Sequence, residues 1–513
     1  SFLILAVVGL AVSAILINHQ RNEAVRQRNV SRRAVDDMYT QVAEKWLAQQ
    51  PNLTALQQSF LEKALGYYEQ FADEPVDGPE MQLGAARARG KVAAIHHKFG
   101  RVDEADRALR RSVEELDDLV ARFPGRVEYR RELALKLYDL AALRLRVGRA
   151  GDAEAPSIRA VSIAEDLAAL QPSVGEARCD LAFLLCKRGN VLHDLRRGVE
   201  AEAALRRSLD LFGTHVGTVA AGPRCRSKYA ECSMTLGLVL VRKRDLPGAE
   251  RAYREALRVQ EALVKQVPDD PDVSYFPCVT LINLARAELV SGRSEEAIAT
   301  FKASSDRLAA LVDRFSDHRG YTSTLVVCLT DLFQILREVG SPEEAEGVGR
   351  RGVELAERLV REYPGVTLHS RELAGILYRL ADFYSIPPDG HPIEPEKALE
   401  LARQAAELEP ENDMALQSLG WAKFRAGDMR GCIEALEKTS YLPKAGDFFA
   451  SMACWHLGDR TRARNLFDQH SNWLDGYENR WNPGTYPSPA MLRRLQAEAA
   501  ALLGVESPRV KAP

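Results

Sequence analysis

Most of the chain carries apolar residues in the pattern of helices, and these helices come in pairs. Residues 133–143 are rich in Leu and Ala without the alternation of a strand, which favours a helix. Residues 249–257 predict the second helix of a pair, which follows a short turn. A proline that cannot continue the second helix ends it, as at Pro124 and Pro268. The pattern therefore predicts helix–turn–helix units.

These units recur at a spacing of 48 residues. One alanine keeps the same place in each unit, at Ala105, Ala153, Ala201, Ala249, Ala297 and Ala345. A turn residue stands five positions earlier, at Gly100, Gly148, Arg196, Arg244, Gly292 and Gly340. Since one helix pair cannot bury its apolar face alone, the repetition predicts a solenoid of stacked pairs. We expect six such repeats over residues 81–385.

The spacing shortens after a Pro-rich break that we expect at residues 386–394. Short repeats are predicted over residues 395–470, where Ala398, Cys432 and Ala463 are 34 and 31 residues apart. The other residues that mark these short units are Leu419, Gly420, Gly427 and Gly458. Residues 471–489 predict an aromatic loop, and residues 490–513 predict a capping helix with a short tail.

The first residues form an apolar run that differs from the rest of the chain. Residues 2–17 carry no charge, and their length is close to the roughly 20 residues of a membrane-spanning helix. We expect a truncated transmembrane helix over residues 1–18, and a juxtamembrane helical stalk over residues 19–80. A signal peptide is the competing interpretation, but its charged leader and cleavage site are missing. Because the chain starts without Met, the natural protein is expected to extend upstream.

The helix pairs resemble the tetratricopeptide repeat (TPR). The residues that carry the resemblance in the most complete copy are Leu236, Gly237, Ala249 and Tyr253, with Arg244 at the turn. The next copy contributes Gly292, Ala297 and Phe301. The resemblance implies an all-α, right-handed superhelical solenoid that binds a protein or peptide in a concave groove. The family repeat has about 34 residues, so the longer units predict helices that are longer by about four turns in total.

The order of the segments also resembles the C-terminal membrane-helix-plus-TPR region of bacterial membrane-anchored serine/threonine protein kinases. Residues 123–134 (FPGRVEYRRELA) and residues 34–39 (AVDDMY) carry this resemblance. It implies an upstream kinase domain for which these repeats are a sensor or docking region. The alternative is a stand-alone, membrane-tethered adaptor without a kinase.

The localisation predicted from these features is a single-pass membrane protein, and the side of the repeats stays open. Five arginines between residues 21 and 33 favour a cytoplasmic repeat domain. The kinase resemblance implies the opposite side, across the membrane from a cytoplasmic kinase.

Composition narrows the class of protein. Lys+Arg 69 against Asp+Glu 72 gives a net charge of -3, which argues against a generally basic nucleic-acid binder. Eight cysteines are too few for a disulfide scaffold. Four of the cysteines form two pairs whose members are seven residues apart, so each pair lies on one face of a helix. We interpret these cysteines mainly as small apolar packing residues, with a metal or redox role as the alternative. These pairs are Cys179 with Cys186, and Cys225 with Cys232.

Motifs with a catalytic mechanism are missing from the sequence. It contains no phosphate-binding glycine loop, no H-E-x-x-H, no G-x-S-x-G and no kinase H-R-D or D-F-G motif. We therefore expect no catalytic residue, no cofactor, no metal, no nucleic acid and no small-molecule substrate. A protein or peptide partner is expected, with residues 2–17 in a membrane. A less favoured alternative is a hydrolase or metalloprotein site around Cys432, Cys454, Trp455 and His456.

Overall fold

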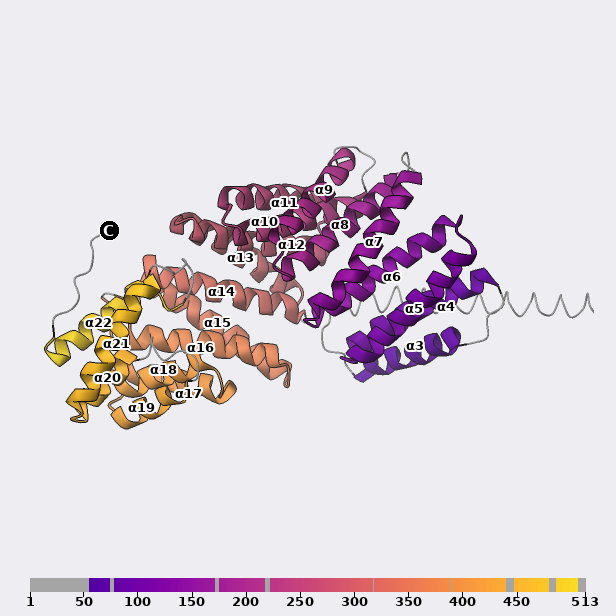
Figure 1. Ribbon diagram of the computed structural model, residues 1–513. Helices are drawn as coiled ribbons and strands as arrows, with labels where there is room; N and C mark the ends of the chain where they lie inside the picture. Colours follow the sequence, from indigo (N-terminus) through magenta and orange to yellow (C-terminus); the bar gives the residue numbers. More distant parts are fainter. Residues whose placement is uncertain are drawn as a thin grey trace, which may run out of the picture. The chain divides into compact units, whose positions relative to one another are not determined.

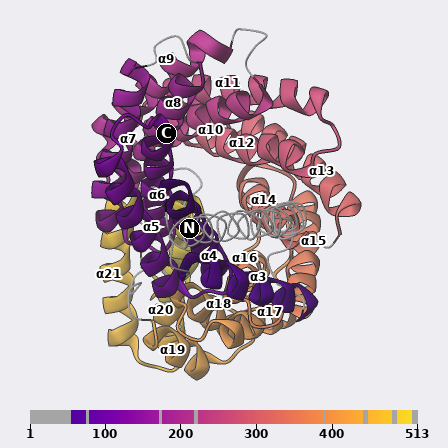
Figure 2. The ribbon, with the colours of Figure 1, turned by 90° about the vertical axis from the view of Figure 1, so that its right-hand side faces the viewer.

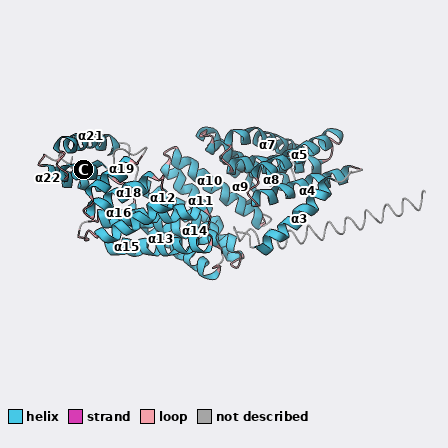
Figure 3. Cartoon of the chain, turned by 90° about the horizontal axis from the view of Figure 1, so that it is seen from below, coloured by secondary structure: helices cyan, strands magenta, loops and turns pink. Residues whose placement is uncertain are grey.

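The computed structural model describes residues 55–73, 78–170, 175–216, 222–316, 318–388, 390–439, 447–478 and 486–505. All regular elements in these ranges are helices, and no strand occurs among them (Figure 3). The prediction of an all-α fold is therefore confirmed. The chain divides into two compact units, Ser1–Leu170 and Gln171–Pro513, which are described separately.

The first unit contains two helix pairs and one preceding helix (Figure 1). Its helices are α3 (Ala55–Asp73), α4 (Pro79–Lys98), α5 (Val102–Arg122), α6 (Val127–Arg146) and α7 (Ala150–Leu170). Helix α4 packs against α5, and α6 packs against α7. Leu61, Leu65 and Tyr68 of α3 pack against Val92 and Ile95 of α4. Helix α3 lies in the segment predicted as a stalk, and it forms part of this packed unit.

The second unit continues the same arrangement. Its helices are α8 (Gly175–Asp194), α9 (Gly198–Val216), α10 (Pro223–Arg242), α11 (Leu246–Gln266), α12 (Pro271–Val290), α13 (Ser294–Arg314), α14 (Arg319–Val339), α15 (Pro342–Glu362), α16 (Thr367–Ser385), α17 (Pro395–Leu408), α18 (Asp413–Arg425), α19 (Met429–Glu437), α20 (Asp447–His456), α21 (Arg460–Glu478) and α22 (Pro489–Leu503). Even-numbered helices from α8 to α16 are called the first helices, and each packs on the second helix that follows it. In the long units each helix has about 20 residues, against 13 and 9 in α18 and α19.

The turn between α10 and α11 shows how a pair is built. Arg244 adopts a φ of 66°, the left-handed conformation that reverses the chain. The carboxylate of Asp245 then accepts a hydrogen bond from the Gly248 N–H at 2.9 Å and caps α11. Helix α11 ends at Gln266, two residues before Pro268. Local chemistry at both ends therefore sets the length of the second helix.

The alanines that recur every 48 residues lie at the contact between the two helices of a pair. All six are 0% exposed, namely Ala105, Ala153, Ala201, Ala249, Ala297 and Ala345. The same holds for Ala398, Cys432 and Ala463 in the short units. A small side chain at this place lets the two helices approach closely, which explains the repeated residue type.

The turn at Gly340 differs from the other turns of the series. Gly340 has φ −106° and ψ −159°, an extended conformation that any residue adopts. A glycine is still required there, because a Cβ would lie 2.7 Å from Leu336 Cδ2 and 2.9 Å from the Leu336 carbonyl oxygen. Ser341 then caps α15, its hydroxyl accepting a hydrogen bond from the Glu344 N–H. Close approach rather than a positive φ selects glycine at this turn.

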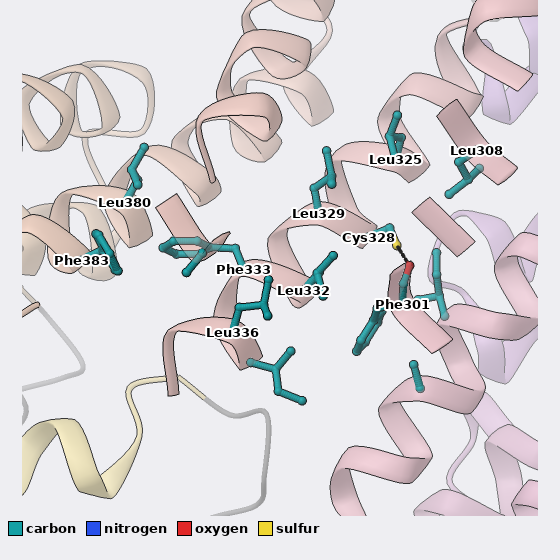
Figure 4. Close-up of a cluster of buried hydrophobic side chains, with 14 of the residues drawn as sticks. Phe301, Leu308, Leu325, Cys328, Leu329, Leu332, Phe333, Leu336, Leu380 and Phe383 are labelled. Atoms are coloured by element: carbon teal, nitrogen blue, oxygen red, sulfur yellow. Dashed lines mark hydrogen bonds between the residues drawn. The ribbon is translucent and has the colours of Figure 1, made fainter. Parts of the chain in front are cut away.

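One continuous apolar core runs through several helix pairs of the second unit (Figure 4). Phe301 of α13, Phe333 of α14 and Phe383 of α16 are each 0% exposed within it. The Cys328 thiol lies 3.5 Å from the Phe301 carbonyl oxygen, which joins α14 to α13. Such a shared core is what stacked pairs require, because no pair buries its apolar face alone.

The C-terminal end of the second unit is helical over a longer stretch than predicted. Helix α21 continues to Glu478, so residues 471–478 of the predicted aromatic loop belong to it. Leu474 is 0% exposed, and the rings of Trp473 and Tyr477 stack at 4.8 Å. Residues four apart lie on the same side of a helix, so the aromatic residues that indicated a loop instead favour another helical turn.

The predicted single-pass membrane localisation is corrected by the structure. Within the ranges that the structure describes, no helix is both long enough and apolar enough to cross a membrane. The reason is visible in α14, which is rich in apolar residues but carries Arg319, Asp331 and Arg337 along its length. The apolar run over residues 2–17, on which the prediction was based, lies outside the described residues.

Candidate docking face on the first helices

The residues that mark the repeat in the sequence are building elements of the array. Gly237 lies opposite Tyr253, and a Cβ on it would lie 2.4 Å from the tyrosine ring. Gly420 has the same relation to Leu436. Turn glycines with a positive φ are Gly100, Gly148, Gly292, Gly427 and Gly458. The remaining marker residues, Leu236, Phe301 and Leu419, pack into apolar cores. These residues position the helices, and a partner surface must be sought elsewhere.

The first helices of the second unit converge. Each first helix from α8 to α14 contacts the next first helix directly, and the same kind of contact joins α16 to α18 and α18 to α20. Comparable packing between successive second helices is not found in the described part of the chain. Figure 2 shows α10, α12 and α14 on the inner side of α11, α13 and α15. The first helices therefore lie on the inside of the curve within this unit.

An aromatic and charged cluster bridges α8 and α10. Lys187 of α8 and Lys228 of α10 both form ion pairs with Glu231. The two ammonium groups also lie 5.2 Å and 4.8 Å from the centre of the Phe183 ring. Burial alone raises the pKa of Glu231, but the two lysines outweigh it and lower this pKa. The cluster therefore holds an ionised carboxylate between two cations beside an aromatic ring.

The same face continues on α12. Phe276 occupies the position of Lys228 one repeat later, 48 residues on, and its side chain is 43% exposed. Nearly three turns further on, Arg286 pairs with Asp331 of α14 at 2.7 Å, and its side chain is 48% exposed. We call the surface formed by Phe183, Lys187, Lys228, Glu231, Phe276 and Arg286 the inner face.

The sequence predicted that the first helices line a groove but identified none of these residues. A usable signal existed, because positions 180, 228, 276, 324 and 372 are equivalent in the repeat. They carry Asp180, Lys228, Phe276, Thr324 and Glu372, so an aromatic residue stands out in an otherwise polar series. Only the structure shows that this series lies where first helices meet.

The chemistry of the inner face fits binding rather than catalysis. It offers an exposed ring together with fixed positive and negative charges, which are the groups that hold peptide segments. Among the described residues no group of three or more His, Cys, Asp or Glu side chains is arranged to hold a metal ion.

The alternative site in the C-terminal region has the wrong electrostatics for a reactive cysteine. Cys432 and Cys454 are 0% and 2% exposed. Burial raises the pKa of Cys432 to about 12 and also raises the pKa of Cys454. Thiols of this kind stay protonated at neutral pH and are poor nucleophiles and metal ligands. Trp455 lies under the Arg460 guanidinium at 3.7 Å, and His456 lies 6.0 Å from the Phe424 ring.

The described part of the chain is built from repeated helix pairs. Residues 230–272, which contain α10 and α11, match the tetratricopeptide repeat family. The match and the pairwise packing support a TPR protein, as the sequence predicted. TPR proteins of this kind are generally non-enzymatic scaffolds for other proteins. No curated protein matches the chain.

Solved structures with similar helix arrangements share little sequence with this chain. BtubC (BKLC) from P. vanneervenii is 19% identical, with 50% of this chain and 92% of that one covered and a TM-score of 0.38. A signal transduction ATPase (STAND) protein with a tetratricopeptide repeat sensor from Pyrococcus horikoshii is 12% identical, with 75% and 52% covered and a TM-score of 0.41. The C-terminal part of a TPR repeat-containing protein from Cytophaga hutchinsonii is 14% identical, with 63% and 99% covered and a TM-score of 0.36.

The resemblance to membrane-anchored kinases is not supported by these comparisons. Three of the residues in the 123–134 segment that carried it are buried in the packing of the first unit. Tyr129 is 1% exposed and contacts the Phe123 ring edge-on at 6.1 Å, while Leu133 and Ala134 are 2% and 3% exposed.

Proposed function

We propose that this chain is a docking scaffold that holds a segment of a partner protein along the inner face. The observation that carries the proposal is the exposed ring of Phe276, which lies where first helices converge. The match of residues 230–272 to the tetratricopeptide repeat supports the same class of function. An apolar side chain of the partner would cover the ring, while the neighbouring charges would fix its orientation.

The expected contribution of Phe276 can be bounded. Burying a phenylalanine side chain fully is worth about 1.5–3 kcal/mol, and Phe276 is already more than half covered. Its removal should therefore cost about 0.6–1.3 kcal/mol of binding free energy, which is roughly a three- to tenfold loss of affinity. Charged side chains at the edge would contribute less each, because water screens them.

The test uses two matched arginines in the full chain. Arg286 on α12 and Arg254 on α11 are both exposed and both hold one carboxylate, Asp331 and Glu250 respectively. Proteins recovered from a lysate of the natural host are compared between the unchanged chain, Phe276→Ala, Arg286→Ala and Arg254→Ala. We expect one partner to be retained by Arg254→Ala and lost or weakened about three- to tenfold by Phe276→Ala. The melting temperature of each variant is measured to check that it folds. If the folded variants all recover the partner equally well, docking on the inner face is contradicted.

A narrower version of this function follows from the sequence resemblance to serine/threonine kinases. The repeats would then dock a substrate or regulator for a kinase domain encoded upstream of Ser1. Residues 34–39 and 123–134 are the support for it. Sequencing the gene upstream tests it, because H-R-D and D-F-G motifs there would support the kinase. Their absence would favour a stand-alone adaptor, and the docking proposal would be unaffected.

A further inference from the structure

Four cysteines meet in two pairs between α8 and α10. The Sγ atoms of Cys179 and Cys225 lie 2.7 Å apart, and both residues are half-buried. Seven residues further along each helix, Cys186 and Cys232 lie side by side and are 2% and 0% exposed. Both pairs therefore join α8 to α10, at two different depths, and all four cysteines are free thiols.

We propose that Cys179 and Cys225 form a reversible disulfide that joins the first helices α8 and α10. Their sulfur atoms need to move by less than 1 Å to reach the bond length of about 2.0 Å. The two helices already contact each other, so the bond needs no rearrangement of the stack. Partial exposure gives a small oxidant access to either sulfur.

The deeper pair, Cys186 and Cys232, is not accessible to an oxidant. Cys232 Sγ is enclosed, with the Ser208 hydroxyl at 3.3 Å and the Leu205 carbonyl oxygen at 3.5 Å. An oxidant cannot reach Cys186 or Cys232 while the helices remain packed. The deeper pair therefore serves as an internal control, because it matches the outer pair in spacing and differs in access.

The reaction needs a two-electron oxidant, for which a small-molecule disulfide such as oxidised glutathione is sufficient. One cysteine loses its proton and attacks a sulfur of the oxidant, which forms a mixed disulfide and releases one thiol. The second cysteine loses its proton and attacks the protein sulfur of that mixed disulfide. The Cys179–Cys225 bond forms and a second small thiol leaves. Two thiol hydrogens and two electrons have then passed from the protein to the oxidant.

The environment of Cys179 sets the expected rate. Burial, and then the hydrogen bond with Cys225, raise the pKa of Cys179 to about 12. Since the thiolate is the attacking species, the reaction at neutral pH is slow without a catalyst. We expect it over minutes to hours, as for other uncatalysed thiol–disulfide exchange.

The bond would lie directly beside the inner face. Phe183 follows Cys179 by four residues on α8, and Lys228 follows Cys225 by three residues on α10, so each pair shares one helix side. Fixing the separation of the two helices fixes the placement of the Phe183 ring against the Lys228 ammonium. If the inner face binds a partner as proposed above, fixing this placement should change the affinity for the partner between the reduced and the oxidised chain. Formation of the disulfide itself does not depend on any partner.

The test is a mass and thiol measurement on the full chain. Reduced protein is incubated with oxidised glutathione in its folded state. One portion is used for the intact mass and for thiol titration after unfolding, and a second portion is blocked with iodoacetamide and digested. We expect a product lighter by two hydrogen atoms, six of the eight thiols still titratable after unfolding, and one cross-linked peptide that contains Cys179 and Cys225. Eight remaining thiols, only glutathione adducts, or a Cys186–Cys232 link would each overturn the proposal.

Serine variants separate the two pairs. Cys179→Ser should still accept a glutathione adduct but should not give the product lighter by two hydrogens. Cys186→Ser should give it at the rate of the unchanged chain. If Cys186→Ser folds poorly, the peptide map of the unchanged chain decides alone. Phe276→Ala separates the disulfide from the proposed function. If this variant loses the partner and still forms the Cys179–Cys225 bond, each proposal has been tested independently of the other.

Discussion

Individual glycines determine how closely the two helices of a pair approach. A Cβ at Gly237 would lie 2.4–2.7 Å from the ring of Tyr253, which is 1% exposed and cannot move aside. We predict that Gly237→Ala lowers the free energy of unfolding by about 1–3 kcal/mol, because overpacking forces the helices apart. Urea unfolding followed by circular dichroism measures it.

The control is the same substitution at a helical glycine without neighbours. Gly347 on α15 is exposed, and a Cβ there would meet no atom within 4 Å. Gly347→Ala should raise the free energy of unfolding by up to about 1 kcal/mol, because alanine favours helix over glycine. Equal effects at Gly237 and Gly347 would show that helix propensity rather than close packing decides at these positions.

A buried carboxyl makes stability depend on pH. Asp382 is 1% exposed, and burial raises its pKa to about 6, even though it accepts a hydrogen bond from Tyr486 and lies near Arg337 and Arg379. In the unfolded chain its pKa is about 3.9. Between these values the folded state binds the proton more tightly, so this contribution to stability falls as pH rises from about 4 to 6.

Asp382→Asn should remove that dependence. We expect the difference in unfolding free energy between the unchanged chain and Asp382→Asn to shift by about 2 kcal/mol between pH 4 and pH 7, in favour of the variant at pH 7. Urea midpoints at pH 4, 5, 6 and 7 measure it. Parallel curves for the two proteins would show that Asp382 titrates alike in the folded and unfolded states.

At the scale of elements, the turn between two helices of a pair requires a left-handed residue. Gly100, Gly148 and Gly292 supply it with φ of 73°, 78° and 77°, whereas Arg196 adopts φ 60°. A side chain in this conformation costs about 1–2 kcal/mol, partly offset by the greater freedom of glycine in the unfolded chain. We predict that Arg196→Gly raises the melting temperature by a few degrees.

The converse substitution tests the same cause. Gly292→Ala places a Cβ at φ 77° in open space, so conformational strain is the main expected effect. It should lower the free energy of unfolding by about 1–2 kcal/mol. A destabilised Arg196→Gly, together with a neutral Gly292→Ala, would contradict the role assigned to the turn.

Local and periodic features of these elements could be predicted from the sequence. An alanine recurs every 48 residues, as at Ala249, because each copy faces the other helix of its own pair. Ala249 is 0% exposed, as this close contact requires. Gly340 shows the limit, since periodicity gives the residue type but not its extended backbone. The contact of Tyr486 with Asp382 joins positions 104 residues apart and has no periodic signal. The pairing of Cys179 with Cys225 did have a periodic signal, because their separation of 46 residues is close to the repeat length of 48 residues.

At the scale of the whole molecule, a stack of helix pairs needs a covered end. In the second unit α22 packs on α20 and α21, with Leu492 and Leu495 both 0% exposed. The Arg425 guanidinium on α18 pairs with Glu498 of α22 at 2.7 Å. Helix α22 therefore closes the apolar surface that the last pair would otherwise leave open.

Leu495→Ala tests this closure. We expect a loss of about 2–5 kcal/mol of local stability and faster amide hydrogen exchange in α20–α22, because a fully buried leucine leaves a cavity. Leu457→Ala is the control, since Leu457 is 46% exposed and should cost less than about 0.5 kcal/mol. Similar exchange in both variants would mean that α22 does not hold the end of the stack.

Site-specific cross-linking distinguishes a partner on the first helices of the second unit from one on the second helices. Phe276, or Arg254 on α11, is replaced by a photoreactive phenylalanine analogue in the full chain, which is irradiated with host lysate. We expect a discrete cross-linked partner from position 276 and none from position 254. Cross-links from position 254 alone would place the partner on the second helices and would rule out docking on the inner face.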